Sequence, residues 1–441
     1  MKKVLILAYD FPPYVSVGGL RPYNWYKYLA LYDVIPIVVT RQWSNELGGY
    51  LDYIADSASK QTIIESETRG TIIRTPYVSN LANRIMLKYG EHKFVIVRRV
   101  ISAFYEFAQW IWAIGPKSNL YFEAKNYLKE HKVDAIIATG DPFILFKYAS
   151  DLSREFNIPW IADYRDAWSQ KKIYQNNFFL QNWTNYLEKQ SLENVLKIVT
   201  VSEFVSRQIS TKISDKQILV LPNGYDPEVI NESQVYNQSA DVLMIAYAGT
   251  IYDWHPFYSF LRTMNQFMLL HPTAKLAINF YGINRTKELR GLLTKEFNEL
   301  QSITFFYERI SNEQLMFELS KNNLLLLFND YSVMGTKIYD YLAAKRAILF
   351  CYSEDVEALQ LKEINFTYDG FKNLNQHLQE DLMKETKSGY ITKDAAHLSL
   401  LVEQLYEEFE KAGNISCKTE NVEKYSRREQ TKSLAEYIKE L

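Results

Sequence analysis

Apolar and polar positions follow two different patterns along this chain. Short runs rich in Val, Ile, Leu, Tyr and Phe are predicted to be β-strands, and between most of them apolar residues recur at helical spacing, as in 255–270 and 312–320. The predicted strands cover 4–9, 34–40, 71–74, 135–138, 160–163, 198–201 and 218–221, followed by 243–248, 275–281, 302–306, 324–328 and 347–350. Strands that alternate with helices predict an α/β fold with mainly parallel, doubly wound sheets.

The length of the chain and two changes of pattern divide these elements into domains. The chain has 441 residues, whereas a domain typically contains roughly 100–200. The segment 223–241 is rich in Asn, Ser, Asp and Glu without sustained periodicity, which is typical of a linker. Near the end, 398–411 and 425–441 have helical patterns with no strand between them. We therefore expect an N-terminal domain over 1–225, a C-terminal domain over 242–412 and a final helix over 425–441.

The composition excludes several classes of protein. The 50 Lys and Arg residues nearly balance the 52 Asp and Glu residues, so we expect no nucleic-acid partner. Cys351 and Cys417 have no C-x-x-C spacing and no two histidines stand at a metal-ligand spacing, so we expect neither a disulfide scaffold nor a metal site. The first apolar run is too short for a signal peptide, and no stretch reaches the roughly 18 apolar residues of a membrane span. These features predict a cytoplasmic globular protein.

The loop after the first strand is the first candidate site, because ligands of open α/β sheets bind beyond the carboxyl ends of the strands. Gly18 and Gly19 begin the next helix, where backbone N–H groups can approach an anion, and Arg21 can add hydrogen bonds to a phosphate. A flexible turn at the two glycines is the alternative. The chain has neither G-x-G-x-x-G nor G-x-x-x-x-G-K-[ST], so neither a dinucleotide oxidoreductase nor a P-loop nucleotidase is indicated.

Carboxylates follow two later strands of the first domain. Asp141 comes after one strand, and Asp163 and Asp166 lie at the end of the next, with Arg165 between them. We expect both loops to lie at the same edge of the sheet, because both follow the carboxyl ends of parallel strands. An Asp–Arg pair that only fixes the loop is the alternative.

In the second domain, the first strand ends at Gly249 and Thr250, and a helix is expected soon after. Asp253 is expected to be the N-cap of that helix. His255 would then lie in its first turn and is the histidine best placed for ligand contact. A capping or surface role is the alternative for His255.

A second helix start in this domain carries Gly335, Thr336, Lys337 and Asp340. Backbone N–H groups at its first turn and the Lys337 ammonium suit a phosphate, and the helix dipole adds roughly 0.3–1 kcal/mol for an anion. Asp340 lies one turn along the same face, where its carboxylate can accept hydrogen bonds from a ribose diol. An ordinary helix start with an exposed Lys–Asp pair is the alternative.

The segment 83–116 departs from the α/β pattern. It combines several Phe, Tyr and Trp residues with two Glu residues and five basic residues, Arg84, Lys88, Lys93, Arg98 and Arg99. Cationic and aromatic side chains on one helix suit a membrane interface or an anionic lipid. The alternative is that the aromatic rings pack on the sheet while the cations extend into solvent.

The order of these motifs resembles a known family. The chain contains, in sequence, FPP…GGLR, ATGDPF, ADYRDAW, VTVSEF, LPNGYD, YAGTIYD, GTKIYDYLAAKRAIL and YSRREQ. This series, which spans nearly the whole chain, is similar to the family 4-like retaining glycosyltransferases of bacterial surface-polysaccharide assembly. The resemblance implies the GT-B fold, with two Rossmann-like domains that face each other across a cleft and a final helix that crosses back to the N-terminal domain.

The resemblance also implies roles for the candidate residues. A nucleotide-diphosphate sugar, UDP- or GDP-linked, would be the donor, and no metal or other cofactor would be required. The expected donor-binding residues are Gly18, Gly19, Arg21, Gly249, Thr250, His255, Thr336, Lys337 and Asp340. Lys337 would also stabilise the leaving diphosphate, and Asp141, Asp163 or Asp166 would orient or deprotonate the acceptor hydroxyl.

The implied activity is sugar transfer, with retention of anomeric configuration, to a glycan or a lipid-linked glycan. A lipid-linked acceptor would bring the chain to the inner face of the cell membrane, with peripheral contact through 83–116. Two alternatives stay open on the sequence alone. One is a catalytically silent scaffold that binds a nucleotide sugar or a glycan, and the other is an epimerase with the GT-B fold.

Overall fold

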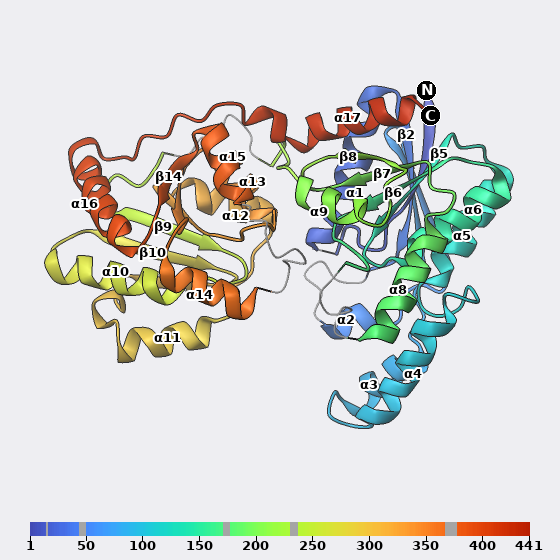
Figure 1. Cartoon of the computed structure of the whole chain (residues 1–441), viewed down its shortest axis with the longest axis horizontal. Coiled ribbons are helices and arrows are strands. Elements are labelled where there is room, and N and C mark those ends of the chain that lie inside the picture. Colours follow the sequence, from blue (N-terminus) through green and yellow to red (C-terminus); the bar gives the residue numbers. More distant parts are fainter. Residues whose placement is uncertain (15, 44–49, 171–176, 230–236, 367–376) are drawn as a thin grey trace. The chain divides into compact units, whose positions relative to one another are not determined.

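The computed structural model describes residues 1–14, 16–43, 50–170, 177–229, 237–366 and 377–441. These residues form two compact units (Figure 1). Unit 1 comprises Met1–Pro222 and Arg427–Leu441, and unit 2 comprises Asn223–Ser426. Residues 230–236 of the expected linker lie outside the described part of the chain.

Unit 1 is built on one sheet, whose described strands have the order β3-β4-β2-β1-β5-β6-β7-β8. Neighbouring strands are parallel, except that β3 is antiparallel to β4. The strands are β1 (Lys2–Leu7), β2 (Val34–Arg41), β3 (Ile63–Glu67), β4 (Gly70–Thr75), β5 (Ala135–Gly140), β6 (Trp160–Tyr164), β7 (Lys197–Thr200) and β8 (Gln217–Val220).

Helices connect the strands of unit 1. They are α1 (Val17–Tyr28), η1 (Leu29–Tyr32), α2 (Tyr50–Ile54), α3 (Leu81–Tyr89), α4 (Val95–Ala108), α5 (Ser118–Glu130), α6 (Ile144–Phe156), α8 (Phe178–Ser191), α9 (Glu203–Ser210) and α17 (Arg427–Lys439). The last of these comes from the far end of the sequence (Figure 1). Leu434, Ala435 and Ile438 of α17 belong to the same buried cluster as Val4 and Ile6 of β1. The C-terminal helix therefore completes the core of unit 1.

Unit 2 has a parallel sheet, whose described strands have the order β11-β10-β9-β12-β13-β14. The strands are β9 (Leu243–Ala248), β10 (Leu276–Tyr281), β11 (Thr304–Tyr307), β12 (Leu324–Phe328), β13 (Ala347–Cys351) and β14 (Gly389–Thr392). The helices are α10 (Phe257–Leu270), α11 (Thr286–Lys295), η3 (Asn298–Leu300), α12 (Asn312–Ser320), α13 (Lys337–Ala344), α14 (Val356–Asn365), α15 (Leu378–Thr386), α16 (Ala395–Ala412) and η4 (Glu423–Tyr425).

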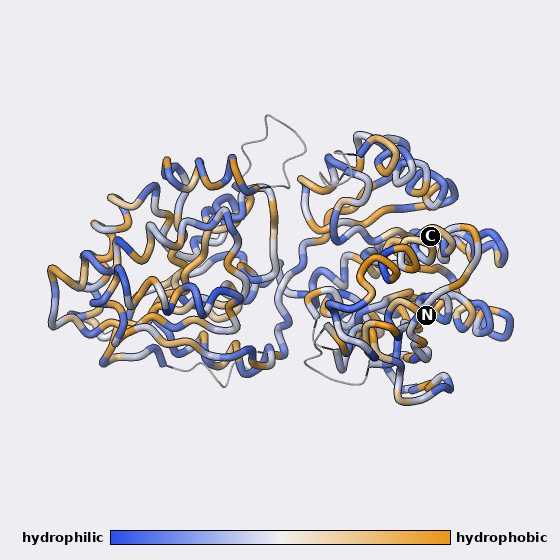
Figure 2. Tube along the Cα trace, turned by 90° about the horizontal axis from the view of Figure 1, so that it is seen from below, coloured by the Kyte–Doolittle hydropathy of each residue, from blue (hydrophilic) through white to orange (hydrophobic). Residues whose placement is uncertain are grey.

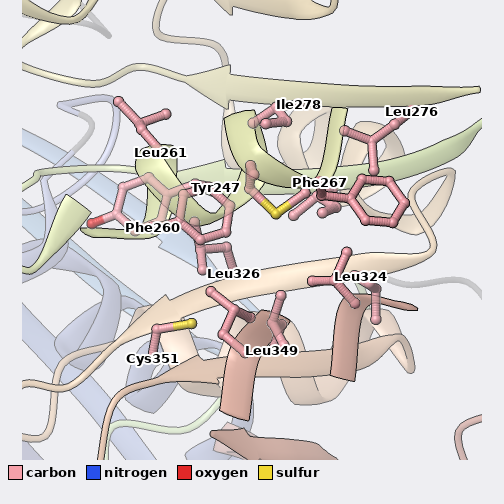
Figure 3. Close-up of a cluster of buried hydrophobic side chains, with 14 of the residues drawn as sticks. Tyr247, Phe260, Leu261, Phe267, Leu276, Ile278, Leu324, Leu326, Leu349 and Cys351 are labelled. Carbon is pink, nitrogen blue, oxygen red and sulfur yellow. The ribbon is translucent and has the colours of Figure 1, made fainter. Parts of the chain in front are cut away.

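The core of unit 2 lies on both faces of its sheet. On one face, Tyr247, Leu326 and Leu349 from three neighbouring strands pack against Phe260 and Leu261 of α10 (Figure 3). Strands that are buried on both faces are continuous apolar runs, and Leu324–Phe328, LLLLF, is buried along its whole length. Figure 2 shows hydrophobic and hydrophilic segments alternating along the trace of both units.

The predicted α/β class is confirmed, and each predicted strand is present with small shifts of its ends. Two strands are missing from the prediction. The side chains of β3 are all exposed, because this strand lies at the antiparallel edge of its sheet. The other, β14, has only four residues, GYIT, and lies at the edge of the second sheet. Neither has the buried apolar run on which strand prediction depends.

The prediction for the start of α10 is wrong. The helix begins at Phe257, with Pro256 at the N-cap, so Asp253 does not cap it and His255 precedes its first turn. Asp253 instead forms an ion pair with Arg285. The proline fixes the local backbone, which explains why the helix starts two residues later than the apolar spacing indicated.

Candidate functional site

Four loop residues meet at the carboxyl edge of the unit 1 sheet. Asp10 follows β1, and Ser16, the N-cap of α1, donates a hydrogen bond from its hydroxyl to Asp10 Oδ2 at 2.6 Å. Burial raises the pKa of Asp10, although Ser16 and the nearby Arg165 act in the opposite direction. Asp10 Oδ1 is buried without a partner among the described residues. Gly18 completes the group, because a Cβ there would overlap the Arg165 guanidinium and come within 2.9 Å of Asp10 Oδ2.

The N–H groups of the two predicted glycines already have partners within the chain. Gly18 N donates to Ser16 Oγ at 3.0 Å, and Gly19 N donates to the Ser16 carbonyl at 3.1 Å. Gly19 is buried, and a Cβ there would lie 3.3 Å from backbone atoms of Asp10 and Phe11. The glycines thus allow close packing of α1 on the loop after β1. Donation of these two N–H groups to an anion would require Ser16 to move.

Replacing Gly18 with Ala is expected to displace Arg165. The Arg165 guanidinium donates to the carbonyls of Gly140 and Asp141, and we expect a loss of about 1–2 kcal/mol when these bonds are disturbed. Urea unfolding of G18A checks this. In an Arg165→Ala background the same change should cost less, because the guanidinium is gone and only the approach to Asp10 Oδ2 remains. The control G291A, in α11 with nothing near its Cβ, should gain about 0.5–1 kcal/mol. A G18A protein as stable as the parent contradicts the expectation.

Arg21 and Asp163 form a buried ion pair inside unit 1. Arg21 Nε donates to Asp163 Oδ1 at 3.0 Å, and the two side chains are 5% and 0% exposed. Arg21 Nη1 also donates to the Leu221 carbonyl at 2.8 Å. Asp163 was predicted to act on an acceptor and Arg21 to contact a diphosphate, but their burial assigns both of them to the interior of unit 1. The pair links α1, β6 and the end of β8.

The other predicted acceptor-side carboxylates remain accessible. Asp141 and Asp166 are exposed, and they follow β5 and β6 at the same edge of the sheet. Arg165 lies between them along the chain and is half-buried, with its guanidinium held over the loop after β5. The structure therefore brings Asp10, Asp141 and Arg165 into one group at the carboxyl edge.

Lys337 is the central cation of unit 2. It is the first residue of α13, and its Nζ donates to the Tyr247 hydroxyl at 2.5 Å and lies 3.8 Å from the centroid of that ring. Tyr247 in turn donates to the Thr250 carbonyl at 2.6 Å. Gly249 lies between them with a φ of +88°, which favours glycine. Burial lowers the pKa of Lys337 to about 8, although Asp330 acts in the opposite direction.

His255 contacts the chain through both ring nitrogens. Nδ1 accepts a hydrogen bond from the Tyr252 N–H at 3.3 Å, and Nε2 lies 2.8 Å from Asp330 Oδ1. This places the ring proton on Nε2, and burial lowers the pKa of His255. The imidazole is therefore neutral and has no ring nitrogen left for a ligand. The prediction that His255 binds the donor directly is not supported by its position.

Asp330 is the hub of this buried network. Besides His255, it accepts hydrogen bonds from Trp254 Nε1 at 3.2 Å and Gln379 Nε2 at 3.1 Å. Burial opposes its charge, but His255, Lys337 and the hydrogen bond from Trp254 hold its pKa below the usual value. Asp330 lies two residues after the end of β12 and ties the loop after β9 to α15 and to the cation at the start of α13. Asp330 in unit 2 thus resembles Asp10 in unit 1, because each carboxylate lies at the carboxyl edge of the sheet of its own unit.

The start of α13 has no side-chain cap. Thr336 is its N-cap, and its side chain makes no capping hydrogen bond. Gly335 has nothing within 4 Å of the position of a Cβ. Thr336, Lys337 and Asp340 are all half-buried, so the structure brings the predicted residues of this helix start together beside Gly249.

Sequence reasoning did not select Asp330, Tyr247, Asp10 or Arg165 as site residues. Asp10 and Asp330 have a signal in common, because each is a carboxylate within three residues of a fully buried strand end. Tyr247 has no such signal, since it reads as a core residue of β9. Arg165 lies between two carboxylates in the sequence. Its role in the group could not be predicted, because the position of its guanidinium depends on contacts with the loop after β5.

The described residues contain no group of three or more His, Cys, Asp or Glu side chains placed to hold a metal ion. Nor do they contain a helix long and apolar enough to cross a membrane.

The family model of Glycosyltransferase Family 4 matches residues 79–229. The match covers about a third of the chain and shows a similarity to glycosyltransferase family 4 in that segment. The matched segment includes β5 and β6 and the loops with Asp141, Arg165 and Asp166. The comparison with curated proteins finds no match.

Similarity to solved structures shows that the chain has the GT-B fold. Sucrose-phosphate synthase from Thermosynechococcus elongatus is 15% identical, with a TM-score of 0.56 over 99% of this chain and 96% of that chain. A trehalose-6-phosphate protein from E. coli bound with UDP-2-fluoro glucose is 10% identical, with a TM-score of 0.59 over 100% and 99%. A trehalose-phosphate synthase from Burkholderia xenovorans in complex with glucose-6-phosphate is 9% identical, with a TM-score of 0.59 over 100% of both chains.

Proposed function

We propose that this glycosyltransferase moves a sugar from a nucleotide-diphosphate sugar to a glycan or lipid-linked glycan, with retention of anomeric configuration, in cell-surface polysaccharide synthesis. In this reaction the bond from the anomeric carbon to the diphosphate breaks and a bond to the acceptor oxygen forms on the same face. The departing diphosphate takes up the negative charge, and the acceptor hydroxyl loses its proton.

The observation that carries the proposal is the placement of Lys337. A cation at an uncapped helix start, next to a glycine with positive φ, suits the developing charge of a leaving diphosphate. Asp340, one turn further along α13, is the proposed partner of the ribose diol. The bound UDP-2-fluoro glucose of the E. coli protein supports a nucleotide-diphosphate sugar as the donor class.

On the acceptor side, Asp141 and Asp166 are the proposed carboxylates. Both are exposed at the carboxyl edge of the unit 1 sheet, where either could orient or deprotonate a sugar hydroxyl. Asp163 is not one of them, because it is buried against Arg21. A lipid-linked acceptor would place the reaction at the cytoplasmic face of the membrane.

The donor class can be tested by thermal unfolding with UDP, GDP, ADP and their sugars. A true donor at 100 times its dissociation constant should add about 2.7 kcal/mol to the free energy of unfolding. The same shift should be much smaller in Lys337→Ala. If no nucleotide or nucleotide sugar shifts the transition, the donor site is not where we propose it.

Product analysis separates the remaining alternatives. A transferase should hydrolyse the stabilising donor slowly or transfer its sugar when an acceptor is supplied. A scaffold would show the stabilisation without either product. An epimerase would convert the donor into its epimer with no acceptor present.

A further inference from the structure

An apolar face of α4 is turned away from the rest of unit 1. Ile96, Val100, Phe104 and Phe107 recur at helical spacing and are all half or more exposed, and Ile111 continues the row beyond the helix. Only Ala108 of α4 is buried. In Figure 1, α3 and α4 lie together at the lower edge of unit 1. The expected alternative, that these aromatic rings pack on the sheet, does not describe α4.

The start of α8 extends this face. The Phe107 ring stacks on Trp183 of α8 with 5.1 Å between centroids, so the two helices are in contact at that point. In the turn of α8 before Trp183, Phe178 and Phe179 are 72% and 83% exposed, and Leu180 is also exposed. We define the α4–α8 surface as Ile96, Val100, Phe104, Phe107, Ile111, Phe178, Phe179 and Leu180. A group of large exposed apolar side chains on two helices that touch through Phe107 and Trp183 is typical of an interaction site.

Exposed cations border this surface. Lys88 and Lys93 lie at the end of α3 and before α4, and Arg99 lies on α4 itself. Among the described residues, neither Lys93 nor Arg99 is found in an ion pair. Arg98 plays a different part, because its guanidinium donates to the carbonyls of Lys93 and Glu91 and closes the turn between the two helices.

We propose that the α4–α8 surface binds the chain to an anionic lipid bilayer. The apolar side chains enter the boundary between headgroups and acyl chains, and Lys88, Lys93 and Arg99 contact anionic headgroups. The inference deepens the proposed function by naming the bilayer as the partner that brings the chain to a lipid-linked acceptor. It also adds α8, which the segment 83–116 does not contain.

Charge favours a bilayer over a second copy of the chain. In a symmetric dimer the same patch faces itself, so each α4–α8 surface would be set against a second surface bordered by the same cations. Juxtaposed like charges oppose such an interface. An anionic bilayer offers an apolar interior and complementary charge together, and this matches the combination of Phe104, Phe107 and Arg99.

The test is co-sedimentation of the full chain with phosphatidylglycerol–phosphatidylcholine vesicles and with phosphatidylcholine vesicles. We expect binding to the anionic vesicles that weakens as salt is raised. Ile96→Asp/Val100→Asp should lower the partition coefficient at least about tenfold, since two apolar contacts are replaced by anions. Lys93→Glu/Arg99→Glu should lower binding to anionic vesicles selectively.

Matched controls lie on unit 2. Ile364 of α14 is 78% exposed, like Ile96, and Leu400 of α16 is comparable to Val100. Ile364→Asp/Leu400→Asp should bind vesicles like the parent. Lys287→Glu/Arg290→Glu, two exposed cations of α11, is the control for the charge change.

The outcomes separate this inference from the proposed function. Failure of the parent to bind anionic vesicles overturns the inference, and so does equal loss in the control variants. A parent that is dimeric by light scattering and becomes monomeric in Ile96→Asp/Val100→Asp also overturns it, because the surface then joins two copies. Nucleotide-dependent thermal shifts are measured on the same variants and should be unchanged. If the parent shows no nucleotide-dependent thermal shift, this result counts against the proposed donor site. It does not affect the conclusion from vesicle binding.

Discussion

Replacing Lys337 with Ala is expected to lower kcat/KM for sugar transfer by on the order of 10²–10³-fold, the usual effect of removing one group that stabilises developing charge. The ammonium lies at the start of α13 beside Tyr247 and Gly249. Folding should not suffer, because burial already opposes the charge of Lys337 and lowers its pKa.

The pH profile gives this prediction a second readout. The pKa of Lys337 is about 8, so the free protein loses the cation as the pH rises through that value. The kcat/KM of the parent should therefore fall above about pH 8, since kcat/KM reports the ionisation of the free enzyme. Lys337→Arg keeps a cation at every accessible pH and should remove this fall, whatever its effect on the maximum.

Lys287→Ala is the matched control, because Lys287 is an exposed lysine of α11 in the same unit. Its kinetics should equal those of the parent. Unchanged transfer by Lys337→Ala would remove Lys337 from the site. A fall in activity above pH 8 that persists in Lys337→Arg would assign the titration to another group.

The sequence was sufficient for the parts of the fold that depend on local pattern. Buried parallel strands such as Leu324–Phe328 are continuous apolar runs, and their order with the intervening helices predicts the two doubly wound sheets. The exposed edge strand Ile63–Glu67 has no such run, and its pairing with Gly70–Thr75 depends on a neighbour in the sheet. Edge strands are therefore the part of this fold that the local pattern of apolar residues does not predict.

The sequence predicts which loops carry the candidate site residues, but it does not predict which side chains those residues contact. The expected donor-binding residues of unit 2 each lie at a strand end or a helix start, and fold topology brings such positions together. They include Gly249, Thr336, Lys337 and Asp340. The partners of His255 and Arg21 were not predictable in this way. They are Asp330 and Asp163, which lie 75 and 142 residues further along the chain. Whether a polar side chain faces a ligand or another side chain depends on such distant pairs.

Replacing Arg21 with Ala is expected to destabilise unit 1 by about 3–5 kcal/mol, because it leaves the Asp163 carboxylate buried without its cation. Asp163 is fully buried, and Arg21 Nε is its hydrogen-bonded partner at 3.0 Å. Urea unfolding measures the loss, with hydrogen exchange of the β1 and β6 amides to assign the transition to unit 1. Arg154→Ala is the control, because its pair with Glu193 is exposed at 46% and 68% and should contribute no more than about 1 kcal/mol.

The double variant Arg21→Met/Asp163→Leu decides between an internal role and ligand contact for this pair. Removing both charges leaves no unpaired ion, so most of the stability lost in Arg21→Ala should return. If the pair acts only within unit 1, the double variant should also keep the nucleotide-dependent thermal shift of the parent. A double variant that regains stability but loses this shift would return Arg21 to the donor site. A stable Arg21→Ala protein would show that the ion pair does not hold α1 to β6.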